Sequence, residues 1–319
     1  MNLGNFCRAL PKLELHAHLN GSLSMDTLKK LYKITNEFSI SNYILCFKVF
    51  DIAHSLAITP EAVFHSTYET IKEFKDDNVI YLELRSTPRY FYLKFYNYRV
   101  CKTDFPSILL KLLISINRKQ GYKAAQENIE LAIDFIKKYP QYIVGLDLSG
   151  DPMTGGTFLE LLEKARVAGL KIAIHCAEIS NETETIDILE FKPDRLGHCT
   201  CIHPTNILNI VLNLLFIFCL ELCLTSNVQC KTVPTYESHQ FKYLFEAGHP
   251  ICLGTDDKGV FHTSLSHEYE IASSTFGLER EQLIKLCLSS VQYAFATLEE
   301  KQAILYRQLM SLDICIKIW

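Results

Sequence analysis

The sequence predicts an α/β fold in which eight parallel strands close into a (β/α)8 barrel, and three observations support this. Across 319 residues, eight short apolar or β-branched runs alternate with longer segments of helical periodicity. The runs are nearly continuous in apolar residues, as strands buried on both sides should be. Ionisable side chains follow the carboxyl ends of several runs, where such barrels hold their active sites. The alternative is an open doubly wound sheet, but no G-x-G-x-x-G turn follows any run.

The expected elements follow one another along the whole chain. The strands span residues 12–19, 79–87, 110–117, 143–150, 170–177, 194–200, 219–227 and 250–257. Between strands, residues 58–77 and 121–140 carry apolar residues at helical spacing. Thr59 and Pro60 suit a helix N-cap and a first-turn proline. We expect a single domain over residues 1–319, with the barrel core at about residues 10–300.

The composition excludes several classes of protein. Hydrophobic residues make up 48% and charged residues 21%, which supports a sizeable core rather than disorder. The net charge of −4 argues against binding to a nucleic acid polymer or to an anionic membrane. The start has no apolar segment of the signal-peptide kind, so the 12 cysteines are expected to be reduced thiols. We therefore expect a cytoplasmic protein, and a monomer.

Two segments invite other interpretations. Residues 207–224 are strongly apolar, but they include Glu221 and fall short of the roughly 20 apolar residues of a membrane span. We expect a buried helix that runs into a buried strand, and no membrane partner. Cys199, Cys201 and His203 form a C-x-C-x-H cluster without a second cysteine pair at finger-like spacing. These cysteines are expected to be core thiols.

His16 and His18 stand two residues apart at the end of the first expected strand, in LELHAHLNGS. Side chains i and i+2 of a strand share a face, so both imidazoles point the same way. Two imidazoles on one face suit a metal ion. Taken alone, the pair is equally compatible with ordinary histidines, so the other strand ends must decide.

The other strand ends carry polar groups that meet at the same mouth of the barrel. These are Ser149-Gly150, His175 with Glu178, His198, Thr225-Ser226-Asn227 and Asp256-Asp257, after the fourth to eighth strands. His16, His18, His175 and one of the aspartates then supply the N and O donors that zinc prefers. Neighbouring strand residues face opposite ways, so we assign Asp256 to the metal and Asp257 to orienting water or substrate.

Two further side chains suit proton transfer. Glu178 follows His175 by three residues and is free to enter the mouth. A carboxyl group in a partly dry pocket can donate a proton near neutral pH. His198 is a candidate for taking a proton from the attacking water, or for stabilising hydroxide electrostatically. A core histidine is the alternative reading of His198 when it is considered alone.

Several motifs in combination resemble the adenosine deaminase superfamily. They are LPKLELHAHLNGS, VGLDLSGDP, HCAE, LGHCT, LTSNV and TDDKGVF. CFKVFDIAHSL, YLELRSTPR, Asn20 and Lys258 resemble more closely its adenosine deaminase-like branch, which acts on N6-methyl-AMP. The likeness extends over about residues 10–300.

The resemblance implies a mononuclear zinc barrel of the metal-dependent hydrolase kind. Its implied zinc ligands are His16, His18, His175 and Asp256. The implied reaction groups are Glu178 as proton donor to purine N1, His198 as the histidine that orients hydroxide, and Asp257 as a contact to hydroxide and N7. The implied substrate contacts are His18, Asp257, the Gly150 backbone at the N3 edge, and Asn20, His54, Ser86 and Thr87 at the sugar and phosphate end.

The expected function is hydrolytic deamination of a 6-aminopurine nucleotide, from N6-methyl-AMP to IMP and methylamine. One zinc per chain is expected, because no lysine follows the fourth strand to bridge two metals. Arg89, Lys231 and Lys258 follow strand ends and are expected to bind the 5′-phosphate, with a solvated surface charge as the alternative for each.

Three other functions stay open at this point. They are deamination of adenosine to inosine, another amidohydrolase reaction on a cyclic amide or amine, and binding by an inactive relative. The sequence departs from the family at Cys199, where glycine is usual, in a shortened segment 33–44, in residues 89–107 and in a short tail. These departures concern the lid and the phosphate contacts rather than the metal ligands.

Overall fold

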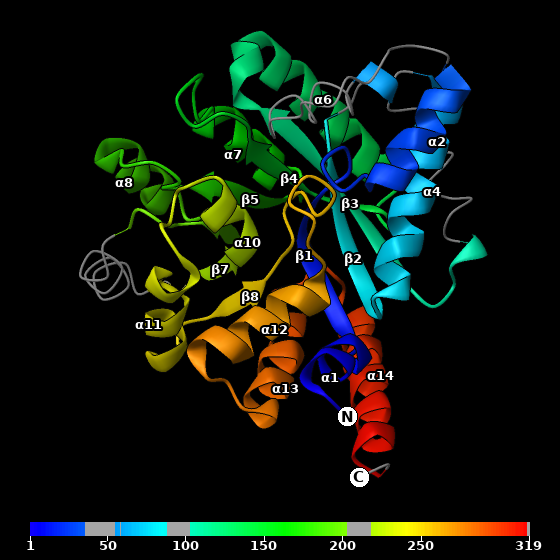
Figure 1. Cartoon of the computed structure of the whole chain (residues 1–319). Helices are drawn as coiled ribbons and strands as arrows, with labels where there is room; N and C mark the ends of the chain where they lie inside the picture. Colours follow the sequence, from blue (N-terminus) through cyan, green and yellow to red (C-terminus); the bar gives the residue numbers. More distant parts are fainter. Residues whose placement is uncertain (36–54, 58, 88–102, 203–217, 318–319) are drawn as a thin grey trace.

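The computed structural model describes residues 1–35, 55–57, 59–87, 103–202 and 218–317. His54 and Arg89 lie outside these residues, as do most of segments 33–44 and 89–107. The helix expected before the seventh strand also lies outside them. The described part contains a single sheet surrounded by helices (Figure 1).

Eight parallel strands form this sheet in the order β1 to β8, which confirms the predicted barrel. Their bounds are β1 Lys12–His18, β2 Val79–Ser86, β3 Leu109–Asn117, β4 Ile143–Ser149, β5 Lys171–Cys176, β6 Arg195–His198, β7 Cys219–Leu222 and β8 Ile251–Leu253. The first and last strands meet at a parallel bridge between Ala17 and Asp256. There the amide of His18 donates to Asp256 O over 3.0 Å, and the amide of Asp256 donates to His16 O over 2.8 Å. The residues after β8 therefore bring its carboxylates beside the histidines of β1.

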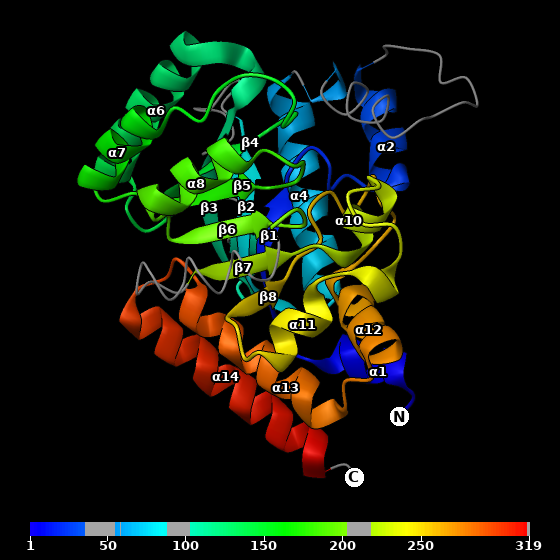
Figure 2. The same cartoon turned by 90° about the vertical axis from the view of Figure 1, so that its left-hand side faces the viewer.

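The helices form the outer layer of the molecule (Figures 1 and 2). Their bounds are α1 Leu3–Ala9, α2 Met25–Thr35, α4 Pro60–Asp76, α6 Gly121–Lys138, α7 Leu159–Val167, α8 Glu182–Phe191, α10 Leu224–Gln229, α11 Phe241–Glu246, α12 Leu265–Phe276, α13 Arg280–Ser289 and α14 Leu298–Lys317, with short 3₁₀ turns η1 Arg118–Gln120, η2 Tyr236–Ser238 and η3 Ser290–Tyr293. Thr59 caps α4 by accepting from the amide of Ala62, and Pro60 is the first residue of that helix, as predicted. Among the described residues, no helix combines the length and apolarity needed to cross a bilayer.

The apolar core lies between the strands and the helices. On β3, the even-numbered residues Leu110 to Ile116 share this core with Ala125 and Ile129 of α6. The odd-numbered neighbours face the other way, and Ser115 Oγ donates to Asp147 inside the barrel over 2.7 Å. The strands are buried on both faces, as expected, but their inner face also holds buried charged residues that the apolar pattern did not predict.

The sixth, seventh and eighth strands are shorter than predicted, and β8 ends at Leu253, so Asp256 and Asp257 follow the strand instead of lying on it. β7 ends at Leu222, and the following residues Thr225, Ser226 and Asn227 lie on α10 instead of continuing the strand. The amide of Thr225 donates to Glu268 Oε2 over 3.1 Å, so a side chain from α12 takes the place of a strand partner. β6 ends at His198, whose φ of 62° cannot continue an extended strand.

Candidate metal and substrate site

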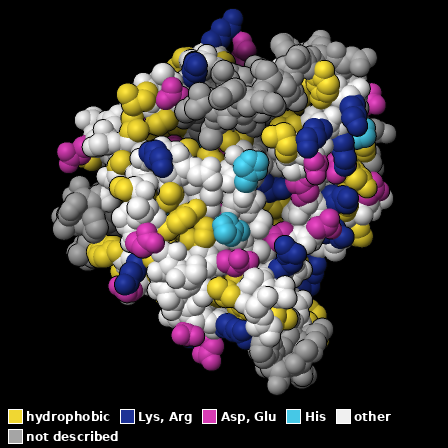
Figure 3. Space-filling model, in the orientation of Figure 1, with side chains coloured by type: hydrophobic (Ala, Val, Ile, Leu, Met, Phe, Trp, Pro, Cys, Tyr) yellow, Lys and Arg dark blue, Asp and Glu magenta, His cyan; other side chains and the backbone are white. Residues whose placement is uncertain are grey.

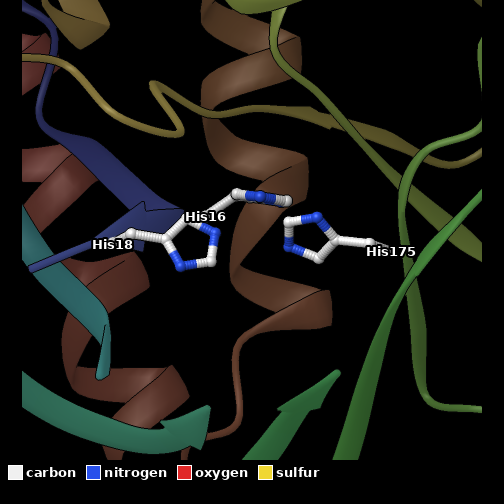
Figure 4. A group of neighbouring side chains, drawn as sticks. All are labelled: His16, His18 and His175. Carbon is white, nitrogen blue, oxygen red and sulfur yellow. The ribbon is translucent and has the colours of Figure 1, made fainter. Parts of the chain in front are cut away.

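Three histidine side chains from two strands point toward one another (Figure 4). His16 and His18 come from β1 and His175 from β5, with the His175 ring centre 4.7 Å from that of His16 and 5.1 Å from that of His18. Each ring offers one nitrogen that lies within 4.8 Å of the other two. The prediction that residues 16 and 18 share a face of the strand is therefore confirmed.

Asp256 completes a set of four potential metal ligands. Its Oδ1 lies 3.5 Å from His16 Nε2 and 3.4 Å from His18 Nε2. Its φ of 58° turns the chain after β8 back toward β1, and Ser226 Oγ donates to Oδ2 over 2.6 Å. His16 Nε2 is buried and has no hydrogen-bond partner in the described part of the chain. A buried nitrogen without a partner costs folding free energy. A cation bound by three imidazoles and one carboxylate would give this nitrogen a partner. These residues therefore fit a zinc ion.

Glu178 and His198 lie next to this set. His198 Nε2 is 3.9 Å from Glu178 Oε2 and 3.9 Å from Asp256 Oδ2. Glu178 Oε1 is 3.4 Å from His175 Nδ1. Burial lowers the pKa of His198 to about 4, so its imidazole is neutral at neutral pH. The structure therefore brings the two side chains assigned to proton transfer to within 3.9 Å of each other.

The charges of His175 and Glu178 depend on each other. Burial alone would lower the pKa of His175, but the charge of Asp147 and hydrogen bonds to Asp147 and Glu178 outweigh it and raise the pKa to about 10. Burial alone would raise the pKa of Glu178, but the fields of His198 and His175 and a hydrogen bond from His175 lower it to about 2. A histidine that binds a metal offers a neutral nitrogen. A bound metal would therefore remove the positive charge on His175 that helps keep Glu178 ionised.

Asp257 lies beside the metal ligands, on the loop between β8 and α12. It is buried, and burial together with the charge of Asp256 holds its pKa well above the usual range. The loop is tied to the one after β1, because the amide of Gly259 donates to Gly21 O over 2.9 Å. The half-buried Asn20 precedes Gly21 in that loop. The structure therefore brings Asn20 and Asp257 to the same end of the barrel as the histidines.

The other predicted substrate contacts lie at the ends of β2 and β4. Ser86 is the last residue of β2 and Thr87 follows it, while Gly150 follows β4. Gly150 has a φ of 104°, and a Cβ there would lie 2.6 Å from Asn117 Oδ1, so a glycine is required. His54, the remaining predicted contact, is outside the described residues.

The two described lysines that were predicted to bind the 5′-phosphate differ in their surroundings. Lys258 is bound to Glu73, and Ser24 and Thr27 donate to the other oxygen of the same carboxylate. Lys258 is therefore engaged by α4 and does not present a free ammonium group. Lys231 is exposed, just beyond α10.

Sequence reasoning missed a buried charged network beneath the histidines. Arg85 of β2 donates to Glu221 of β7, and over 2.8 Å to Asp147 of β4. Glu221 Oε2 lies 2.7 Å from His16 Nδ1, and Asp147 Oδ1 lies 3.4 Å from His175 Nε2. The side chains of Arg85, Asp147 and Glu221 are all 0% exposed. One guanidinium thus connects two carboxylates that each contact a candidate metal ligand.

The surface around the site is mixed in charge. On the face that Figure 1 presents, Figure 3 shows histidine side chains near the centre with an acidic side chain beside them, and both basic and acidic side chains over α2 and α4. In the part of this face that the structure describes, no broad basic patch is present.

Known proteins resemble the chain over nearly its whole length. An adenosine deaminase family model matches residues 11–309. N6-methyl-AMP deaminase of Danio rerio is 40% identical, over 93% of this chain and 94% of the relative. The crystal structures of Arabidopsis ADAL complexed with GMP and with IMP are both 32% identical to the chain. Each covers 96% of this chain and 98% of its own, with TM-scores of 0.87 and 0.84 respectively. The chain therefore belongs to the adenosine deaminase family, whose activity is hydrolytic deamination.

Proposed function

We propose that this chain is a zinc-dependent deaminase of a 6-aminopurine nucleotide, and that it hydrolyses N6-methyl-AMP to IMP and methylamine. The observation that carries the proposal is one cluster at the barrel mouth: three histidines and Asp256 as ligands, with Glu178, His198 and Asp257 beside them. The relatives named above support the choice of substrate, since one is an N6-methyl-AMP deaminase and another is complexed with IMP.

We assign His16, His18, His175 and Asp256 to a single zinc ion. When bound, zinc supplies a water of lowered pKa and a positive charge near the carbon under attack. The chain contributes the orientation of these ligands. Ser226 holds Asp256, Glu221 holds His16, and the bridge between β1 and β8 fixes the strand ends that carry three of the four ligands.

The remaining side chains handle the substrate and its protons. Glu178 gives a proton to N1, which makes C6 electrophilic, while oxygen from water attacks C6. Asp257 accepts a hydrogen bond from the attacking water or donates one to N7, according to its protonation state. The two protons of the water balance the reaction: one returns to Glu178, and the other goes to the leaving nitrogen, so that methylamine departs from C6. Asn20, His54, Ser86, Thr87 and the Gly150 backbone form the rest of the pocket in this proposal.

We further propose that the protein acts in the cytoplasm as a monomeric single-domain enzyme. The cysteines that the structure describes are free thiols, most of them buried, which suits a reducing compartment.

The test compares four substrates at equal concentration with purified protein: N6-methyl-AMP, AMP, N6-methyladenosine and adenosine. The first pair isolates the methyl group, and N6-methyl-AMP against N6-methyladenosine isolates the phosphate. We expect the highest kcat/KM for N6-methyl-AMP. Adenosine turned over as fast as N6-methyl-AMP would reverse the assignment.

Deamination of adenosine is the second candidate, and one observation favours it. Lys258, which was expected to bind the phosphate, is instead held by Glu73. If no other cation or aligned donor replaces it, a free nucleoside becomes the better substrate. The comparison with N6-methyladenosine separates these two cases.

A further inference from the structure

A line of four groups leads from a backbone amide on α11 to the imidazole of His198. The amide of Phe241 donates to Nδ1 of His239 over 3.0 Å. Nε2 of His239 lies 3.0 Å from Oδ1 of Asn227, and Nδ2 of Asn227 lies 3.0 Å from Nδ1 of His198. The side chains that this relay joins are His239, Asn227 and His198.

The direction of every hydrogen bond in the relay follows from its first member. A backbone N–H can only donate, so Nδ1 of His239 must accept. His239 is then neutral with its proton on Nε2, and it donates to the oxygen of Asn227. The amide of Asn227 therefore turns its NH₂ group toward His198, and Nδ1 of His198 must accept. The single ring proton of a neutral His198 is left on Nε2.

The surroundings prevent water from reversing these roles. His198 and Asn227 are each 1% exposed and His239 is 3% exposed. Asn227 is fixed by its backbone, because its carbonyl accepts from Thr232 Oγ1 and from the amide of Val233. The backbone of His198 is held by Gln240, whose Nε2 donates to the His198 carbonyl over 2.9 Å. The donor and the acceptor of each hydrogen bond in the relay are therefore set by the protein and not by solvent.

We propose that His239 and Asn227 are positioning residues that hold His198 as the Nε2–H tautomer, so that it donates a hydrogen bond to the attacking oxygen instead of accepting its proton. Nε2 faces the site, 3.9 Å from both Glu178 Oε2 and Asp256 Oδ2. A preformed donor aimed at an oxygen that gains negative charge stabilises the transition state without reorganisation. The inference rests on the proposed deaminase function, and it decides between the two roles that the sequence leaves open for His198.

The test changes Asn227 to aspartate in the zinc-loaded enzyme. An aspartate accepts from both neighbours, so Nδ1 of His198 must become the protonated nitrogen. Long-range ¹H–¹⁵N spectra of histidine-labelled protein distinguish a protonated from an unprotonated ring nitrogen, and a His198→Asn variant assigns the signal. In the unchanged chain we expect Nδ1 unprotonated and Nε2 protonated. In Asn227→Asp we expect Nδ1 protonated, turnover reduced by about 10²-fold or more, and zinc content unchanged.

Two further variants separate this role from simple structural support. His239→Gln keeps an acceptor toward Phe241 and a donor toward Asn227, so the His198 ring signals should stay as they are in the unchanged chain. Asn181→Asp adds the same charge at the exposed N-cap of α8, where an aspartate caps equally well, and should leave both signals and turnover unchanged.

The outcomes are distinguishable from failure of the proposed function. A chain with zinc but no deaminase activity on any 6-aminopurine would refute the function and leave the tautomer measurable. An active chain whose His198 carries its proton on Nδ1 would overturn the inference. So would Asn227→Asp with a protonated Nδ1 and undiminished turnover, or with lost turnover and an unchanged tautomer.

Discussion

Gly21 stands against the carboxylate of Asp257, and a Cβ at this glycine would lie only 1.5 Å from Asp257 Oδ1. The φ of Gly21 is outside the left-handed region, so an alanine there is opposed by this contact rather than by its backbone. Gly21→Ala should therefore displace the Asp257 carboxylate and leave the fold intact. A displacement of about 1 Å in a reacting group can cost about 10²-fold in rate. We expect that loss in kcat, with zinc content unchanged.

Gly156→Ala is the matched control. A Cβ there would meet Phe158 Cε1 at 3.4 Å, which is ordinary contact, and Gly156 also has no positive φ. Its kcat and melting temperature should stay near those of the unchanged chain. If Gly21→Ala were equally harmless, Asp257 would have no required position in the reaction.

Glu178→Gln tests the proposed proton donor. Glutamine keeps the size of the side chain but has no carboxyl proton to give to N1. Acid catalysis supplies about 10²–10⁴-fold, so turnover should fall by that range. Zinc content should be retained, because Glu178 is not among the four proposed ligands. Near-normal turnover by the variant would remove Glu178 from the mechanism.

The polar groups at strand ends could be predicted because strand geometry and barrel topology determine where they lie. His16 and His18 share a face by alternation, and the parallel order of the strands brings His175 and Asp256 to the same end. Their roles stay predictions, but their proximity follows from strand alternation and from the parallel order of the strands. The position of the four candidate ligands at one end of the barrel could therefore be predicted from the sequence.

The network beneath the histidines was missed although a signal for it exists. Glu83 and Arg85 stand two residues apart in VIYLELRS, and Glu221 interrupts the apolar run CLEL. The alternation used for the histidine pair places such charges together on one face of a strand. Which partner each charge meets, however, depends on register between distant strands. The helix α10 was missed for a similar reason, since its first turn is held by a contact from a distant element, the hydrogen bond that the amide of Thr225 donates to Glu268 of α12.

Arg85→Lys tests the role of this network in metal binding. Lysine keeps the positive charge, but a single ammonium group cannot bind Asp147 and Glu221 in the geometry of a guanidinium. The orientation of His16 and His175 should loosen. Loss of such supporting contacts costs about 10–100-fold in metal affinity. Competition with a chromogenic chelator measures the zinc affinity directly, without relying on turnover.

Arg195→Lys is the comparison for Arg85→Lys. Arg195 binds Glu83 and, through Nε, Glu221 Oε1 at 2.7 Å, which is the oxygen that does not face His16. The Arg195→Lys variant should lower the free energy of unfolding, but it should change the zinc affinity less than Arg85→Lys does. Equal zinc affinities for Arg85→Lys and the unchanged chain would show that the network only supports the fold.

Lys258→Met tests whether the engaged lysine contributes to substrate binding. Its ammonium group is bound to Glu73 and lies 5.3 Å from the centre of the Phe74 ring. Methionine keeps the apolar contact and leaves Glu73 with its bonds from Ser24 and Thr27. We expect a modest loss of stability and an unchanged ratio of kcat/KM for N6-methyl-AMP to that for N6-methyladenosine. A ratio that falls at least tenfold would show that Lys258 leaves Glu73 to bind the phosphate.

His239 should make the fold sensitive to acid. Burial and the neighbouring His198 lower its pKa from 6.5 to about 3. Between these values the unfolded chain binds a proton at this residue and the folded chain does not, so stability falls as the pH falls. The stability that the neutral His239 contributes is fully present above pH 6.5 and is lost progressively down to about pH 3.

The variant His239→Gln tests this expectation, because glutamine cannot bind the proton and the variant should therefore lose less stability as the pH falls. Urea unfolding of zinc-free protein at pH 7 and pH 5 measures this, because metal release then plays no part. One pKa unit corresponds to about 1.4 kcal/mol, so the stability gap between the two chains should shift by about 2 kcal/mol in favour of the glutamine variant. Parallel stability curves for the two proteins would mean that His239 is protonated in the folded state, which its bond from the Phe241 amide does not permit.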